Sequence, residues 1–132
     1  MDRASTPTSR SLAEELYDAA IGKLADGDSR AAIDGFRASL AADSEFRDAA
    51  HGLIHALKNA GELGEAVALA ERLIADDPDD VLAYTSLSIL YQHQGKIPEA
   101  EAAAIRAKLV GWKQQLREIG RASCRERVFL SV

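Results

Sequence analysis

Three glycines recur at a fixed interval, and this regularity constrains the fold of the chain more than any other feature of its sequence. Gly27, Gly61 and Gly95 lie 34 residues apart (61 − 27 and 95 − 61). Five positions after each glycine stands an alanine, at Ala32, Ala66 and Ala100. A 34-residue period is typical of stacked helix–turn–helix units. We therefore expect an array of helical hairpins, which favours a binding scaffold over an enzyme.

The period divides the chain into three units, residues 13–46, 47–80 and 81–114. Within each unit, apolar or small residues recur at steps of three and four, which is the pattern of a helix with one buried face. The glycine is expected to end the first helix, because glycine adopts the left-handed C-cap conformation without strain. The alanine is expected where the second helix crosses the first, because closely packed helices need small side chains there.

Short polar residues and prolines mark the expected starts of the helices. Asp28 directly follows Gly27 and is a suitable N-cap for the second helix of the first unit. Pro98 fits the first turn of the last helix, where its missing N–H group costs nothing. Asp77 and Pro78 precede the third unit, and we expect the aspartate to cap its first helix and the proline to open it.

Together, these residues give the chain a resemblance to the tetratricopeptide repeat family. The middle unit is the most similar, with Leu53, Gly61, Ala66 and Pro78. The third unit has Trp112 where that proline is usual, and otherwise carries Leu87, Tyr91, Gly95, Ala100 and Ala107. The first unit is the least similar, with Lys23 where an aromatic residue is usual.

The resemblance covers residues 11–117. It implies an all-α fold, a right-handed superhelical solenoid of three helix–turn–helix repeats with a C-terminal helical extension. A nonrepetitive helical bundle is the alternative, because periodicity alone does not exclude it.

The two ends of the chain lack this periodicity. Residues 1–10 are polar, and we expect a disordered leader there. Order should begin at Ser11, because Ser11 and Glu14 have the spacing of a capping box. Residues 119–128 are similar to the conceptual translation of a short-read sequencing adapter. We therefore interpret residues 118–132 as an artefactual tail, with a genuine basic tail as the alternative.

Composition and charge exclude several classes of function. The formal net charge is −5, with Lys and Arg interspersed among Asp and Glu, so we expect no nucleic acid as partner. No apolar run is long enough to span a membrane and the N-terminus has no hydrophobic signal segment, so we expect a cytoplasmic protein without a membrane partner. A single cysteine, Cys124, forms no internal disulfide framework.

Catalytic motifs are missing from the sequence as well. No Ser/His/Asp or Cys/His set stands at a defined site, and no glycine-rich phosphate loop follows a strand. We therefore expect no enzymatic activity and no cofactor.

The resemblance also implies where a partner binds, because in this family the first helices of successive units line a concave face. Transferred to this chain, the groove consists of Tyr17, Ile21, Asp48, His51, His55, Lys58, Asn59, Leu82, Thr85, Ile89, Gln92 and His93. The same set of family places also includes Glu14, Asp18, Leu24, Ala25, Gly52 and Ser86. The expected partner is a protein or peptide, since extended peptides and helices suit such a surface.

One subclass of the family is excluded by its side chains. Members that bind the C-terminal tails of chaperones clamp a carboxylate with Lys, Arg and Asn side chains. The corresponding places here are Tyr17, Ile21, Gly52, Leu82 and Ser86. Because charge-assisted capture of a carboxylate needs cationic donors, we do not expect a receptor of that kind.

Two histidines of the groove lie four residues apart. His51 and His55 therefore share one helix face, and Asp48 lies one turn earlier as a third potential metal ligand. We favour solvated groove histidines over a metal site, because the His-x-x-x-His pattern is common. We hypothesise that these two imidazoles, together with that of His93, make the affinity for a partner sensitive to pH between about 5 and 7.

A second apolar stripe follows the third unit. Ile105, Leu109, Trp112 and Leu116 recur at steps of four, three and four. Three explanations remain open: Trp112 folds back as a cap over the last unit, the stripe is buried by further chain, or it is the face of a homodimer. The last gives the alternative function, a structural homo-oligomer that assembles through this stripe.

Overall fold

All regular structure in the part of the chain described here is α-helical. A computed structural model describes residues 8–130, and the side chains of residues 8–122. Its six helices are α1 (Ser9–Ala25), α2 (Ser29–Ala42), α3 (Arg47–Asn59), α4 (Leu63–Asp76), α5 (Val81–His93) and α6 (Ile97–Leu130). The prediction of an all-α solenoid of three hairpins is therefore confirmed.

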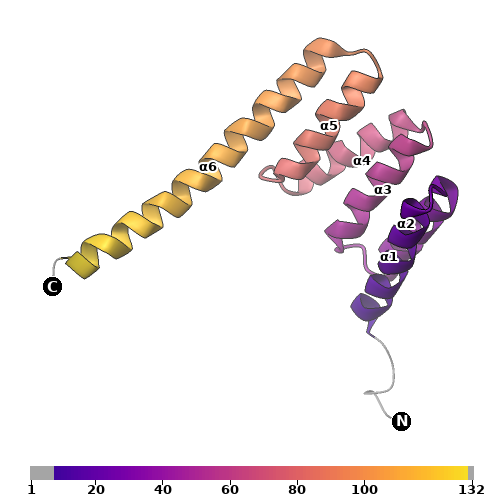
Figure 1. Ribbon diagram of the computed structural model, residues 1–132, viewed down its shortest axis with the longest axis horizontal. Helices are drawn as coiled ribbons and strands as arrows, with labels where there is room; N and C mark the ends of the chain where they lie inside the picture. The colour runs from indigo at the N-terminus through magenta and orange to yellow at the C-terminus, as the bar shows by residue number, and fades with distance from the viewer. Residues whose placement is uncertain (1–7, 131–132) are drawn as a thin grey trace, which may run out of the picture.

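The helices repeat in register with the glycine period. The second helix of each hairpin begins at residue 29, 63 or 97, and these starts are 34 residues apart (63 − 29 and 97 − 63). Each helix packs against the next one along the chain, and the first helices also contact one another, α1 with α3 and α3 with α5. Figure 1 shows the result, three hairpins laid side by side with α6 extending beyond them.

The three turns share one hydrogen-bonding pattern. Gly27, Gly61 and Gly95 have positive φ angles of 83°, 83° and 76°. After each glycine, the next residue donates its amide to a carbonyl in the last turn of the preceding helix, as Glu62 does to Leu57 at 2.9 Å. This bond closes a Schellman-type cap, which requires a left-handed residue at the glycine position. The prediction that glycine ends each first helix is confirmed.

The turn geometry predicts opposite effects for two neighbouring glycine substitutions. Gly61→Ala is expected to lower the free energy of unfolding by about 1 kcal/mol, because alanine is strained at positive φ. A Cβ atom at Gly61 meets no atom within 4 Å, so the loss is due to backbone strain and not to a clash. Gly64→Ala, inside α4 and equally free of contacts, is expected to stabilise by up to about 1 kcal/mol. Urea unfolding of both variants measures the difference, and equal effects would contradict this explanation.

Small side chains bring the helices together, as the sequence predicts. The recurring alanines Ala32, Ala66 and Ala100 are buried. Among the described side chains, the two buried polar ones are Ser39 and Ser88, and each donates a hydrogen bond to a backbone carbonyl of the neighbouring helix, at 2.6 and 2.8 Å. Because both hydroxyls have partners, their burial carries no desolvation penalty of an unpaired group.

An aromatic cluster joins the first hairpin to the second. The Tyr17 ring contacts the Phe36 and Phe46 rings in tilted geometry, with centroids 5.8 and 5.3 Å apart. Arg10 lies over the Phe46 ring, 4.3 Å from its centroid. Tilted aromatic pairs of this kind stabilise packing beyond the area that they bury.

Two of the predicted helix starts differ from the structure. Helix α1 begins at Ser9, two residues before Ser11, because the Thr8 hydroxyl accepts a hydrogen bond from the Ser11 amide at 3.0 Å. The remainder of the expected leader, residues 1–7, lies outside the described residues.

The aspartate that caps α5 is Asp80 and not Asp77. Its carboxylate accepts the Ala83 amide at 3.0 Å, whereas Asp77 accepts the Asp79 amide within the preceding turn at 3.1 Å. Pro78 therefore lies in that turn, before the helix. The predicted cap at Asp28 is confirmed by its bond from the Ala31 amide at 3.1 Å, and Pro98 lies in the first turn of α6.

The last helix continues beyond the packed hairpins (Figure 1). It reaches Leu130, so it includes the adapter-like segment, while any docking of residues 128–132 falls outside the described side chains. The idea that Trp112 caps the last unit is wrong, because 62% of its surface is exposed. Among the described residues, no helix is long and apolar enough to cross a membrane.

Candidate partner-binding groove

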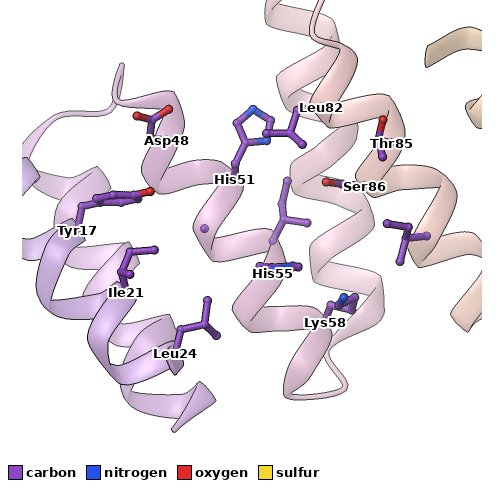
Figure 2. A pocket seen from close by; sticks show the side chains of 13 residues that line it. Tyr17, Ile21, Leu24, Asp48, His51, His55, Lys58, Leu82, Thr85 and Ser86 are labelled. Atoms are coloured by element: carbon purple, nitrogen blue, oxygen red, sulfur yellow. The ribbon is translucent and has the colours of Figure 1, made fainter. Parts of the chain in front are cut away.

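The first helices of the three hairpins line an open, groove-shaped cavity of about 340 Å³. Helix α1 contributes one side, α3 the floor and α5 the other side (Figure 2). The lining residues are Tyr17, Ile21, Leu24, Asp48, His51, Gly52, Ile54, His55, Lys58, Leu82, Thr85, Ser86 and Ile89.

Most of the expected groove residues lie in this cavity. Of the twelve assigned to the groove, only Asn59, Gln92 and His93 are not among the lining residues. These three belong to the last turns of α3 and α5, beyond the end of the cavity. Of the six other family places, Leu24, Gly52 and Ser86 also line it, whereas Glu14, Asp18 and Ala25 do not. Ile54 also lines the cavity. The sequence does not predict this, because an apolar residue on a helix has the same pattern whether it lies in the core or lines a cavity.

Apolar side chains on facing helices line the cavity. Ile21 on α1 and Leu82 and Ile89 on α5 keep 39%, 54% and 37% of their surface exposed. Leu24 and Ile54 extend the same apolar lining. Since large aliphatic side chains gain free energy when they leave water, such a converging set is a surface suited to contact.

Gly52 matters here because it lets α3 approach the first hairpin. A Cβ atom at this position would lie 2.5 Å from the Cε1 atom of Phe36. The Phe36 ring is fully buried. The glycine thus allows α3, which forms the floor of the cavity, to pack directly against the Phe36 ring.

An ionic cluster fixes one end of the cavity. Asp80 accepts a hydrogen bond from Arg47 and contacts the Nε2 atom of His51 at 2.9 Å. Arg47 also donates to the Leu73 carbonyl near the end of α4, at 3.1 Å. The cluster therefore joins α3 to the end of α4 and the start of α5. At the corresponding junction of the first hairpin, Phe46 takes the place of Asp80, and aromatic packing replaces charge.

The pKa of Asp80 is lowered by this environment. Burial alone raises the pKa of the carboxyl, which is the largest single effect. The hydrogen bonds from Arg47 and the Ala83 amide, together with the charges of His51 and Arg47, outweigh burial and bring the pKa below its ordinary value. The carboxylate is thus ionised in the folded protein at neutral pH.

Sequence comparison decides the family. The tetratricopeptide repeat profile matches residues 23–88, which is half of the chain and includes the turns at Gly27 and Gly61. The chain belongs to the tetratricopeptide repeat family. No curated protein matches it in sequence.

Solved tetratricopeptide repeat structures are similar over most of the chain. Two crystal structures of MamA share 25% identity with it and give TM-scores of 0.72 and 0.71. Each alignment covers 78% of this chain, and 60% and 56% of the respective MamA chains. This chain therefore matches a little over half the length of MamA.

The Yersinia enterocolitica type III secretion translocator chaperone SycD, in an alternative dimer, is similar over nearly its whole length. The identity is 20%, the TM-score is 0.72, and 98% of each chain is covered. At this identity the similarity concerns the fold. Tetratricopeptide repeat proteins are typically non-enzymatic scaffolds for protein–protein interaction, and the family and fold of this chain support a general role as an interaction adaptor.

The tetratricopeptide repeat groove contains two of the three histidines that the sequence analysis proposed as pH-sensitive. Burial, and secondarily the charge of Lys58, lower the pKa of His55. His51 is held by Asp80, and His93 is not among the cavity residues. His51 and His55 are thus the two of these histidines that line the cavity. Within the described residues, no three His, Cys, Asp or Glu side chains are grouped to hold a metal ion.

Proposed function

We propose that the protein is an adaptor whose concave groove binds an apolar segment of a partner protein, either a helix or an extended peptide. The observation that carries this proposal is the convergence of Ile21, Leu82 and Ile89, from two helices, on one preformed cavity. Burial of apolar surface stabilises a complex by about 25 cal/mol per Å² before the costs of association. Because the groove is already formed by α1, α3 and α5, binding needs little rearrangement, and this keeps the free-energy cost of association low.

Charged groups at the two ends of the cavity give the partner a preferred direction. Asp48 lies beside Tyr17 at one end, and Lys58 lies near the opposite end (Figure 2). A bound segment is therefore oriented with a basic group toward Asp48 and an acidic group toward Lys58. Such charges govern specificity and the rate of association more than affinity.

A single charge in the groove is expected to abolish this binding. Peptides selected from a displayed random library on the immobilised full chain should share apolar anchors. Ile89→Glu should weaken their affinity by at least about tenfold, because the complex would bury an unpaired carboxylate. The matched control is Ala68→Glu, which adds the same charge at an exposed position of α4.

Fluorescence anisotropy of labelled peptides measures both variants. Ala68→Glu should bind the peptides with wild-type affinity, and Ile89→Glu should lose affinity for them. Equal binding to both variants would place the binding surface elsewhere.

A further inference from the structure

Helix α6 carries an exposed apolar seam that the groove does not use. Ile105, Leu109, Trp112 and Leu116 keep 57%, 48%, 62% and 66% of their surface exposed. Their steps of four, three and four (109 − 105, 112 − 109, 116 − 112) put all four on one side of the helix. This is the spacing of the a and d positions of a coiled coil. We call these four residues the α6 seam.

The α6 seam occupies a face that the other two hairpins leave polar or small. Counting back by 34 and 68 residues from Ile105 gives Glu71 and Arg37, and both are exposed. The counterpart of Leu109 in the middle unit is Ala75, also exposed. Apolar residues at these places are therefore particular to the third hairpin and are not part of the repeat pattern.

The face on which a further repeat would stack is a different one. In the first unit it includes the buried Ile33 and the half-buried Leu40. The corresponding residues of α6 are Glu101 and Lys108, both charged and exposed. A solenoid ends where its stacking face becomes polar. The α6 seam is thus not a stacking surface for another repeat, and its apolar residues need another explanation.

The charges beside the α6 seam are positive. If Leu109 and Leu116 are a positions, the flanking e and g positions are occupied by Arg106, Lys113, Lys108 and Gln115. Lys113 lies 3.9 Å from Asp79, which also pairs with Arg117, but Arg106 and Lys108 make no ion pair with any described residue. Charges at e and g set the choice of partner in a coiled coil.

These flanks oppose pairing with a second copy of the chain. In a parallel pair of α6 helices, Lys108 of one copy faces Lys113 of the other, and in an antiparallel pair like charges meet as well. Juxtaposed like charges destabilise an interface. We propose that the α6 seam binds an amphipathic helix of another protein, with apolar residues at coiled-coil spacing and acidic residues beside them. This site is independent of the concave groove.

Two designed peptides of three heptads each test this proposal with the full chain. Both carry leucine at a and d, and they differ only at e and g, which are glutamate in one and lysine in the other. The glutamate peptide should bind at least about tenfold more tightly by calorimetry, and added salt should reduce the difference. Its binding should also change the fluorescence of Trp112, the single tryptophan.

Three variants locate the site. Trp112→Ala should weaken binding of the glutamate peptide by at least about tenfold, because a central aromatic anchor is lost. The double variant Arg106→Glu, Lys108→Glu should reverse the preference in favour of the lysine peptide. Ile89→Glu, in the groove, should leave binding unchanged. Thermal unfolding confirms that each variant is folded, as expected for changes at exposed positions.

The results that would overturn the proposal are equally specific. Equal affinity for both peptides, or binding of neither, would refute the proposal that the α6 seam and its cationic flanks select acidic helices. A wild-type dimer in sedimentation equilibrium that becomes monomeric in Trp112→Ala would show that a second copy occupies the seam. Loss of peptide binding in Ile89→Glu with full binding in Trp112→Ala would assign the interaction to the groove.

Discussion

Phe36→Ala is expected to lower the free energy of unfolding by about 3–5 kcal/mol, the largest effect of any substitution considered for this protein. The ring is fully buried, contacts Tyr17, and lies between the first hairpin and α3. Its removal leaves a cavity at the junction on which the groove depends. Guanidinium unfolding followed by circular dichroism measures the loss, and a change below about 1 kcal/mol would contradict the assigned packing.

Gly52 supplies the control for this prediction. Gly52→Ala alone should be destabilising by about 1–3 kcal/mol, because its Cβ atom would lie 2.5 Å from the Phe36 ring. In the Phe36→Ala background the same methyl group enters the space that the ring has left, so its cost should vanish or reverse. Additive effects in this double-mutant cycle would show that the two positions are not in contact.

Asp80→Ala is expected to destabilise the protein by about 2.5–4 kcal/mol. The substitution removes the N-cap of α5, which contributes about 1 kcal/mol, and the charged hydrogen bond from Arg47, which contributes about 1.5–3 kcal/mol. Because Arg47 is partly exposed, water still solvates its charge in the Asp80→Ala variant. We therefore expect a loss of stability in the lower half of this range. Asp79→Ala is the matched control, because Asp79 is more exposed and caps no helix. An equal loss in both variants would contradict the role of the cluster.

Asp80→Asn separates the charge of the cluster from the cap. Asparagine is as good an N-cap as aspartate, so only the charged contacts are lost. Because the folded-state pKa of Asp80 is lowered, its ionised form stabilises the protein fully above the unfolded value of 3.8. That contribution disappears as the pH falls through the lower, folded-state pKa. Wild type should therefore exceed Asp80→Asn in stability at pH 7, and the difference should shrink below about pH 4.

The sequence predicts the helical framework well because its turns depend on local chemistry. A glycine at positive φ and a small residue at a helix crossing are requirements that few residues satisfy, so their spacing locates Gly27, Gly61 and Gly95 without tertiary information. Helix caps are less well determined. Asp77 and Asp80 have the same chemistry, and only the backbone path after Pro78 decides which carboxylate meets an α5 amide.

Contacts between hairpins are the features that the sequence does not reveal. Arg47, His51 and Asp80 meet only after α3, α4 and α5 have packed, and their separation of up to 33 residues gives no local signal. The resemblance to the family predicts most of the residues that line the cavity, because its period assigns the same face in each unit, and their binding of a partner stays a prediction. That transfer does not tell which apolar side chains reach the cavity, as Ile54 shows.

We propose that α1, α3 and α5 together present the binding surface. An NMR titration of the ¹⁵N-labelled full chain with a library-selected peptide tests it most directly. We expect amide shift changes concentrated around Ile21, His55 and Ile89, on all three of these helices. Changes confined to the outer helices α2 and α4 would contradict it.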